Sequence, residues 1–129
     1  MKLVVTEHGS ELAVELWEMR HPAASSALSY PEGRAALAAA RRAGRLTADA
    51  HRRSLEDFEA THGELWVVGV DAALARHAGE LAEELGLRGY DAVHLASALA
   101  LGADTTLMTW DTELARAGAL VGCAVAPAP

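Results

Sequence analysis

The chain has 129 residues and a formal net charge of −7. Hydrophobic residues make up 51% of it and charged residues 22%, which excludes an intrinsically disordered protein. A single cysteine excludes an internal disulfide and a cysteine-based metal site, and no apolar stretch approaches the roughly 20 residues that a membrane helix needs. We therefore expect a single domain over residues 1–126, a short tail over 127–129, and a cytoplasmic protein.

Helical segments and short apolar runs alternate along the chain. In chain order, the apolar spacing and the β-branched runs predict helix 10–19, strand 23–28, helix 29–44, helix 46–61, strand 65–70, helix 71–85, helix 90–103, strand 106–110, helix 111–117 and strand 121–126. The helix over 90–103 is apolar nearly all round, so we expect it to be central and buried. Short apolar strands separated by helices indicate a mostly parallel α/β sheet covered on both faces.

A local basic segment stands out in this acidic chain. Six of the 11 basic residues fall between residues 34 and 53, namely Arg34, Arg41, Arg42, Arg45, Arg52 and Arg53. A solvated helix face, a track for RNA phosphates and a surface for a partner protein each account for this cluster.

Acidic residues follow several of the predicted strands. Glu32, Asp71 and Asp111 each come after a strand, and Asp91 opens the buried helix that leads into the strand over 106–110. Ligands of an open parallel sheet bind at the carboxyl ends of its strands, so these acids are the candidates for a site. Asp104 lies at the start of its strand, on the opposite edge, and is not a candidate.

Each of these acids also has a purely structural interpretation. Ser29 and Glu32 have the spacing of a capping box, and each of the three aspartates precedes a helix, where aspartate is a preferred N-cap. Carboxylates gathered at one edge repel each other, however, and such a cluster is tolerated mainly when a divalent cation neutralises it. Mg²⁺ or Mn²⁺ prefers carboxylate oxygens and would serve phosphodiester chemistry.

Other reactive side chains give weaker indications. His94 lies one helical turn after Asp91, so it either touches the same site or is a buried, hydrogen-bonded core histidine. Ser25 and Ser26 lack a nearby base, and the chain has no glycine-rich phosphate loop.

Three segments, SSALSYPEGRAAL, RGYDAVHLASAL and TLMTWDTEL, resemble the PIN domain family, specifically VapC-type toxins of toxin–antitoxin pairs. The resemblance runs from about residue 2 to residue 126. It implies a three-layer α/β/α fold with a small, mostly parallel sheet, and an Mg²⁺- or Mn²⁺-dependent endoribonuclease silenced by an antitoxin. It further implies that Glu32, Asp91 and Asp111 are the catalytic, metal-binding acids, whereas Asp71 corresponds to a helix cap.

The chain departs from the family at its N-terminus. Family members open with a strand that ends in an Asp-Thr/Ser-Ser-Ala motif, and residues 1–10 resemble the segment that follows this motif. We therefore expect the first central strand and one metal-binding aspartate to be absent, and a native start about ten residues upstream, judged from typical strand lengths.

The favoured hypothesis is a metal-dependent ribonuclease toxin of a VapBC-like pair, with an RNA substrate, an antitoxin partner and a homodimeric state. The alternative is a catalytically impaired, N-terminally truncated PIN-like module that only binds an antitoxin or another partner protein. A third hypothesis is a fragment that does not fold by itself.

Overall fold

The computed structural model describes residues 3–6 and 23–126, which divide into two compact units. Residues 3–6, 23–27 and 66–126 belong to the first, called the sheet unit below. Residues 28–65 form the second, called the helical hairpin. The helix predicted over residues 10–19 lies outside the described residues.

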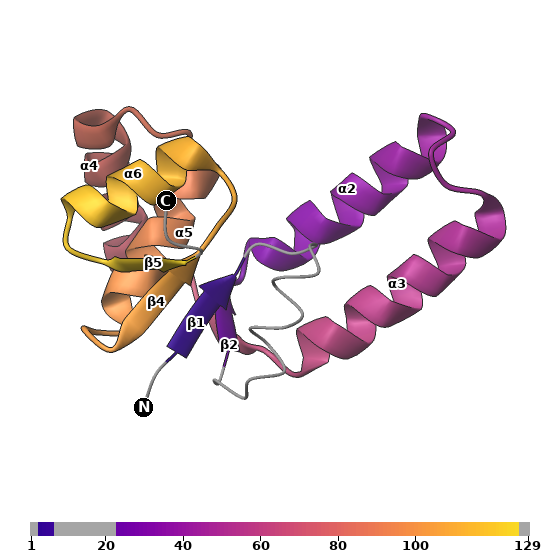
Figure 1. The fold of residues 1–129 in the computed structure, drawn as a ribbon, viewed down its shortest axis with the longest axis horizontal. Coiled ribbons are helices and arrows are strands. Elements are labelled where there is room, and N and C mark those ends of the chain that lie inside the picture. The colour runs from indigo at the N-terminus through magenta and orange to yellow at the C-terminus, as the bar shows by residue number, and fades with distance from the viewer. Residues whose placement is uncertain (1–2, 7–22, 127–129) are drawn as a thin grey trace. The chain divides into compact units, whose positions relative to one another are not determined.

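The sheet unit contains five parallel strands (Figure 1). The strands are β1 (Leu3–Thr6), β2 (Ala23–Ser26), β3 (Trp66–Val68), β4 (Thr105–Met108) and β5 (Ala124–Ala126). Their order across the sheet is β3-β2-β1-β4-β5, and every neighbouring pair is parallel. The predicted α/β class with a small parallel sheet is confirmed, and all four strands predicted in residues 23–126 are present.

The expectation that the first central strand is absent is wrong. β1 occupies the centre of the sheet, where Val4 pairs with Ala23 of β2 on one side and with Thr106 of β4 on the other. The sequence of β1, LVVT, is rich in β-branched residues, which favour strands. A strand at this position supplies the hydrogen-bond partners that β2 and β4 would otherwise lack.

Three helices belong to the sheet unit: α4 (Ala72–Leu85), α5 (Gly89–Ala100) and α6 (Thr112–Leu120). α4 begins after its N-cap Asp71 and ends at Gly86, whose φ of 68° lies in the left-handed region that favours glycine. α5 packs against α4 and against strands β2 and β4, while α6 packs against β4 and β5. The predicted central, buried position of the helix in this segment is confirmed.

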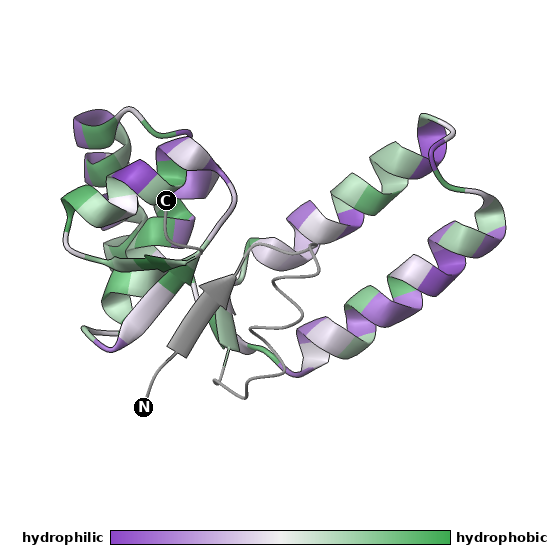
Figure 2. Ribbon diagram, viewed as in Figure 1, coloured by the Kyte–Doolittle hydropathy of each residue, from purple (hydrophilic) through white to green (hydrophobic). Residues whose placement is uncertain are grey.

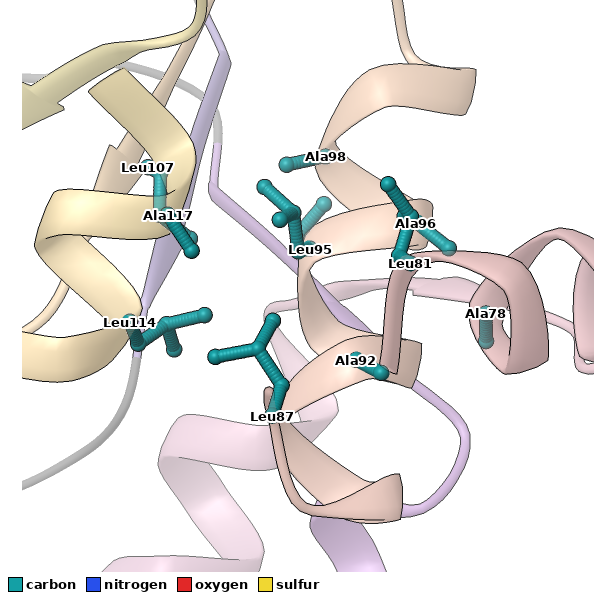
Figure 3. Packing of buried hydrophobic residues seen from close by; sticks show 11 residues of the cluster. Ala78, Leu81, Leu87, Ala92, Leu95, Ala96, Ala98, Leu107, Leu114 and Ala117 are labelled. Atoms are coloured by element: carbon teal, nitrogen blue, oxygen red, sulfur yellow. The ribbon is translucent and has the colours of Figure 1, made fainter. Parts of the chain in front are cut away.

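The core of the sheet unit is built around α5 (Figure 3). Leu95 of α5 is fully buried and faces Leu107 of β4 and Leu114 of α6. On the side of α4, the small residues Ala92 and Ala96 are also fully buried. Small side chains let two helices approach closely, whereas the leucines fill the wider space between α5, β4 and α6. The first turn of α5 is therefore held by a packed core.

The helical hairpin consists of α2 (Ser29–Arg42) and α3 (Ala48–Gly63), which pack side by side (Figure 1). Gly33 is the one buried residue of α2, and a side chain there would collide with the ring of Phe58. The Tyr30 hydroxyl donates to Glu59 Oε1 at 2.5 Å, and Arg34 pairs with the same oxygen at 2.9 Å. α3 has no fully buried residue and carries largely hydrophilic side chains (Figure 2).

None of the helices in the described part of the chain is both long enough and apolar enough to cross a lipid bilayer.

Candidate active site

The order of the strands marks one edge of the sheet for ligand binding. From β1 the chain order runs to β2 and β3 on one side and to β4 and β5 on the other, so β1 lies at a topological switch point. Ligands of open α/β sheets bind outside the carboxyl ends of the strands at such a point. α5 precedes the parallel strand β4 in the chain and returns the chain to the start of that strand. The N-terminal turn of α5 and the loop after β4 therefore both lie toward this edge.

Asp91 lies in the first turn of α5 and is buried, with a relative exposure of 8%. Its interpretation as the N-cap is wrong, because Arg88 is the N-cap and Asp91 is the third residue inside the helix. Its one ion pair in the described residues is with Arg88, whose Nε lies 3.6 Å from Asp91 Oδ2. The Arg88 side chain is 85% exposed, so this pairing is loose.

The pKa of Asp91 is raised above its ordinary value. Burial is the largest cause, because it removes water from the charged form, and the negative charge of Asp111 is the second. Arg88 acts in the opposite direction and lowers the pKa, without cancelling the other two effects. The charges of Asp91 and Asp111 therefore interact, and burial together with this interaction disfavours the ionised form of Asp91.

Asp111 is fixed in the loop between β4 and α6. Its Oδ1 accepts the backbone N–H of Leu114 at 3.0 Å, which confirms the prediction that it caps a helix. Its own backbone N–H donates to the hydroxyl of the buried Thr109 at 3.0 Å, and the backbone N–H of Thr109 donates to the carbonyl of Ala126. Asp111 Oδ2 has no hydrogen-bond partner in the described part of the chain.

Glu32 belongs to the helical hairpin, where it lies exposed in the first turn of α2. The capping-box interpretation of Ser29 and Glu32 is wrong. Leu28 is the N-cap and has no side-chain cap bond, while the Ser29 hydroxyl is buried without a partner among the described residues. The strand ladder extends to Ala27, whose N–H donates to the carbonyl of Val68. The helix begins at Ser29 as predicted, but its N-cap lies one residue before the predicted one.

Two of the three predicted acids, Asp91 and Asp111, thus belong to the sheet unit and interact through their charges. Across residues 3–6 and 23–126, no group of three or more His, Cys, Asp or Glu side chains is arranged to hold a metal ion. The assignment of Glu32 to the same site stays a prediction.

The other candidate residues have structural roles. Asp71 caps α4 through a bond from the backbone N–H of Leu74 at 2.8 Å, as predicted. His94 is fully buried and its ring stacks on Tyr90, with centroids 6.3 Å apart. Neither ring nitrogen of His94 has a partner among the described residues, so the expected hydrogen bond is absent there. Burial lowers the pKa of His94 to about 4, so its ring is neutral at pH 7.

The family model of the PIN domain matches residues 1–120. The chain belongs to the PIN domain family. The three segments that suggested it from the sequence fall on the start of α2, on α5, and on β4 with α6, and each carries one of the predicted acids.

Two curated PIN domain relatives come from Mycobacterium tuberculosis. They are Ribonuclease VapC45 of strain CDC 1551 / Oshkosh and Ribonuclease VapC49 of strain H37Rv. Each is 49% identical to this chain over 133 residues, which cover 99% of this chain and 90% of the relative.

Solved structures share the fold. PAE2754 from Pyrobaculum aerophilum is 27% identical, with a TM-score of 0.66 over 90% of this chain and 83% of that one. FitAcB from Neisseria gonorrhoeae is 19% identical, also with a TM-score of 0.66, over 97% of this chain and 96% of that one. A toxin–antitoxin complex from Klebsiella pneumoniae is 19% identical, with a TM-score of 0.59 over 81% of this chain and 76% of that one.

The place of β1 in this PIN domain adds a residue that the sequence analysis did not consider. Glu7 directly follows β1 in the sequence and itself lies outside the described residues. Glu7 becomes a candidate only once LVVT is assigned as the central strand. The residues around Glu7 do not form the family's opening motif, so the sequence alone did not indicate it.

Proposed function

We propose that this protein is a metal-dependent endoribonuclease, the toxin of a VapBC-like toxin–antitoxin pair. The observation that carries the proposal is the buried carboxylate of Asp91, whose pKa is raised by burial and by the charge of Asp111. Keeping two interacting carboxylates at the carboxyl edge of a parallel sheet is unfavourable unless a cation compensates them. The identity of 49% to two VapC ribonucleases supports RNA as the substrate.

The residues present fit a hard divalent cation such as Mg²⁺ or Mn²⁺. Such ions prefer carboxylate oxygens and are commonly held by one or two carboxylates, together with water and substrate phosphates. Among the described residues, Asp91 is paired only loosely, with exposed Arg88, and Asp111 Oδ2 has no partner. We assign Asp91 and Asp111 as the acids that hold the ion, with Glu32 as the third acid that the family resemblance implies.

When bound, the ion would activate a water molecule for attack and stabilise the charge that develops on the phosphodiester. The chain's own contribution is to hold the carboxylates in fixed positions. Asp91 is part of a helix that is packed on several sides, and Asp111 is fixed by its bond to Leu114 and by the Thr109 hydroxyl. This rigidity lowers the cost of arranging the site during the reaction.

We further propose a cognate antitoxin as protein partner, a homodimeric state, and a cytoplasmic location where RNA is available. Several structural relatives are toxin–antitoxin assemblies, among them VapBC-1 from nontypeable Haemophilus influenzae and VapBC2 from Rickettsia felis. The chain shares the fold of VapBC-1, with a TM-score of 0.63 over 96% of this chain and 95% of that one.

Two substitutions at Asp111 test the site while separating chemistry from stability. Asp111→Asn retains an oxygen that can cap α6 and removes the charge, so stability should change little while Mg²⁺-dependent RNA cleavage is lost. Asp111→Ala removes both, so it should also lower the free energy of unfolding by about 1 kcal/mol. The measurements are cleavage of labelled single-stranded RNA with Mg²⁺ or with EDTA, and urea unfolding.

Asp71 offers the matched control, because it caps α4 in the same way and is not part of the proposed site. Asp71→Asn and Asp71→Ala should repeat the stability pattern while cleavage stays at the parent rate. Unchanged cleavage by Asp111→Asn, or equal loss in both pairs of variants, would contradict the assignment of Asp111.

The dependence of cleavage on pH tests the role of Asp91. Metal binding needs the ionised carboxylate, so the raised pKa of Asp91 should place the acid limb of the profile above the ordinary aspartate range. Arg88 lowers this pKa, and Arg88→Gln should therefore move the acid limb to still higher pH. Profiles of cleavage between pH 4 and 9, compared with those of Arg116→Gln, measure the shift. An acid limb at the same pH in Arg88→Gln would show that Asp91 does not control it.

A further inference from the structure

The helical hairpin ends in a tip that is crowded with arginines. The tip comprises the last turn of α2, the connecting loop and the first turns of α3, and its arginines are Arg41, Arg42, Arg45, Arg52 and Arg53. All five are exposed. The two helices run side by side and are joined at this end (Figure 1). The arginines, which lie in the last turn of α2, in the loop and in the first turns of α3, therefore belong to one end of the hairpin.

The charge of the tip is opposite to that of the rest of the protein. Residues 41–53 contain these five arginines and one acid, Asp49, so the segment carries a formal charge of +4. The whole chain carries −7, which leaves −11 for the remaining residues. Such a separation of charge produces a local positive potential that attracts polyanions to this end of the hairpin.

Most of these arginines have no acidic partner. Within the described residues only Arg52 is paired, with Asp49 at 3.3 Å, and both of those side chains are largely exposed. Arg34, at the other end of α2, is by contrast held by Glu59 and Tyr30. The dipole of α2 favours Arg41 and Arg42 in its last turn, but Arg53 lies near the N-terminal end of α3, where a cation gains nothing from the helix.

The composition of the tip points to phosphate groups as its ligand. Guanidinium groups bind phosphate through paired hydrogen bonds, which single ammonium groups do not reproduce. Leu46, which is half-buried, is the only large apolar residue between 41 and 53, and the segment has no Phe, Trp or Tyr. A protein interface usually centres on buried aromatic or apolar anchors, and base recognition in single strands uses aromatic stacking. Contacts to a nucleic-acid backbone need neither.

We propose that the arginine tip is a docking site for the phosphate backbone of single-stranded RNA, distinct from the acidic pair Asp91 and Asp111. This inference rests on the proposed function, which supplies RNA as the ligand. The tip lies about 14 Å from the first turn of α2. This distance follows from the rise of an α-helix over the nine residues from Glu32 to Arg41. Its contacts are sequence-independent, so it raises affinity for RNA without selecting a sequence.

The test compares two double variants with the same change in charge. Arg45→Gln/Arg53→Gln removes two tip cations, and Arg76→Gln/Arg116→Gln removes two exposed cations of the sheet unit. Binding of a fluorescent single-stranded RNA is measured by anisotropy in EDTA at several salt concentrations. The tip variant should bind several-fold more weakly, and the slope of log Kd against log salt should fall by about 1.4, which is 0.7 for each phosphate contact.

The control variant should keep both the affinity and the salt slope of the parent protein. Arg45→Lys/Arg53→Lys preserves the charge, and it should retain most of the salt slope while losing part of the affinity. Equal weakening in the tip and control variants would show a general charge effect and overturn the proposal. An unchanged RNA affinity in the tip variant would overturn it too, as expected if the tip binds an acidic protein instead.

Cleavage measurements separate this proposal from the proposed function. With Mg²⁺ present, the tip variant should show a raised KM for RNA and an unchanged kcat, because the acidic pair is intact. If the parent protein binds RNA through the tip but cleaves none with Mg²⁺ or Mn²⁺, the ribonuclease proposal fails and the docking site stands. If cleavage depends on Asp91 while the tip variant binds RNA normally, the docking site fails and the ribonuclease stands.

Discussion

Asp91→Asn should reduce metal-dependent RNA cleavage by more than about 100-fold, a larger loss than is typical of residues that only support a metal ligand. The substitution keeps the size and shape of the side chain but removes the negative charge that we assign to metal binding. Asp91 is not the N-cap of α5, and its pairing with exposed Arg88 at 3.6 Å is loose, so the fold should be kept. The readouts are RNA cleavage with Mg²⁺ and binding of Mg²⁺ by calorimetry, both of which should be lost.

The same substitution should leave stability at pH 7 unchanged or increase it when no divalent ion is present. The pKa of Asp91 is raised in the folded protein, so folding favours its protonated form. Its stabilising contribution is complete below the unfolded-state pKa and disappears as the pH rises through the folded-state pKa. At pH 7 the ionised carboxylate therefore lowers the free energy of unfolding, and replacing it with the neutral amide of asparagine removes this destabilisation. Thermal unfolding in EDTA between pH 3 and pH 8 measures this effect.

Asp57→Asn is the matched control, because Asp57 is exposed on α3 and the change in charge is the same. It should leave cleavage, Mg²⁺ binding and stability at the parent values. Cleavage by Asp91→Asn at the parent rate would rule out our assignment of the site. If Asp91→Asn were much less stable than the parent protein, Asp91 would have a structural role. The burial of its side chain and the charges around it do not predict such a role.

Leu95→Ala should lower the free energy of unfolding by about 2–5 kcal/mol, because it leaves a cavity in the centre of the core. Leu95 has no exposed surface and faces Leu107 of β4 and Leu114 of α6 (Figure 3). The loss is large against a typical total stability of about 5–15 kcal/mol, and it corresponds to a fall in Tm of about 10 °C. Urea and thermal unfolding of the full chain provide the measurement.

Leu120→Ala provides the comparison, because the same side chain is 65% exposed at the end of α6. Its effect should stay within about 0.5 kcal/mol. Below its lowered Tm, Leu95→Ala should still cleave RNA, since no atom of Leu95 belongs to the proposed site. Equal stability of the two variants would mean that α5 is not the centre of the core. Absence of any cooperative transition in the parent protein would favour the hypothesis of a fragment that does not fold by itself.

Short sequence patterns predicted the starts of some helices of this PIN domain correctly and the starts of others wrongly. The caps Asp71 and Asp111 are recognisable because an aspartate precedes a run of helical spacing, and both accept the predicted backbone hydrogen bonds. The same signal was misleading at Asp91 and Ser29, because the helices there begin earlier, after Arg88 and Leu28. Neither of these N-caps uses its side chain, so the sequence around them carries no cap signal.

The sequence by itself determined the α/β class, the buried character of the helix around Leu95, and the acids worth testing. These follow from periodicity and from motif spacing, which depend on neighbouring residues. Only the tertiary structure decided that LVVT is the central strand, and that burial, together with the charge of Asp111, raises the pKa of Asp91. Strand order and the approach of two distant side chains depend on packing between remote segments, since a strand's own residues do not specify its neighbours.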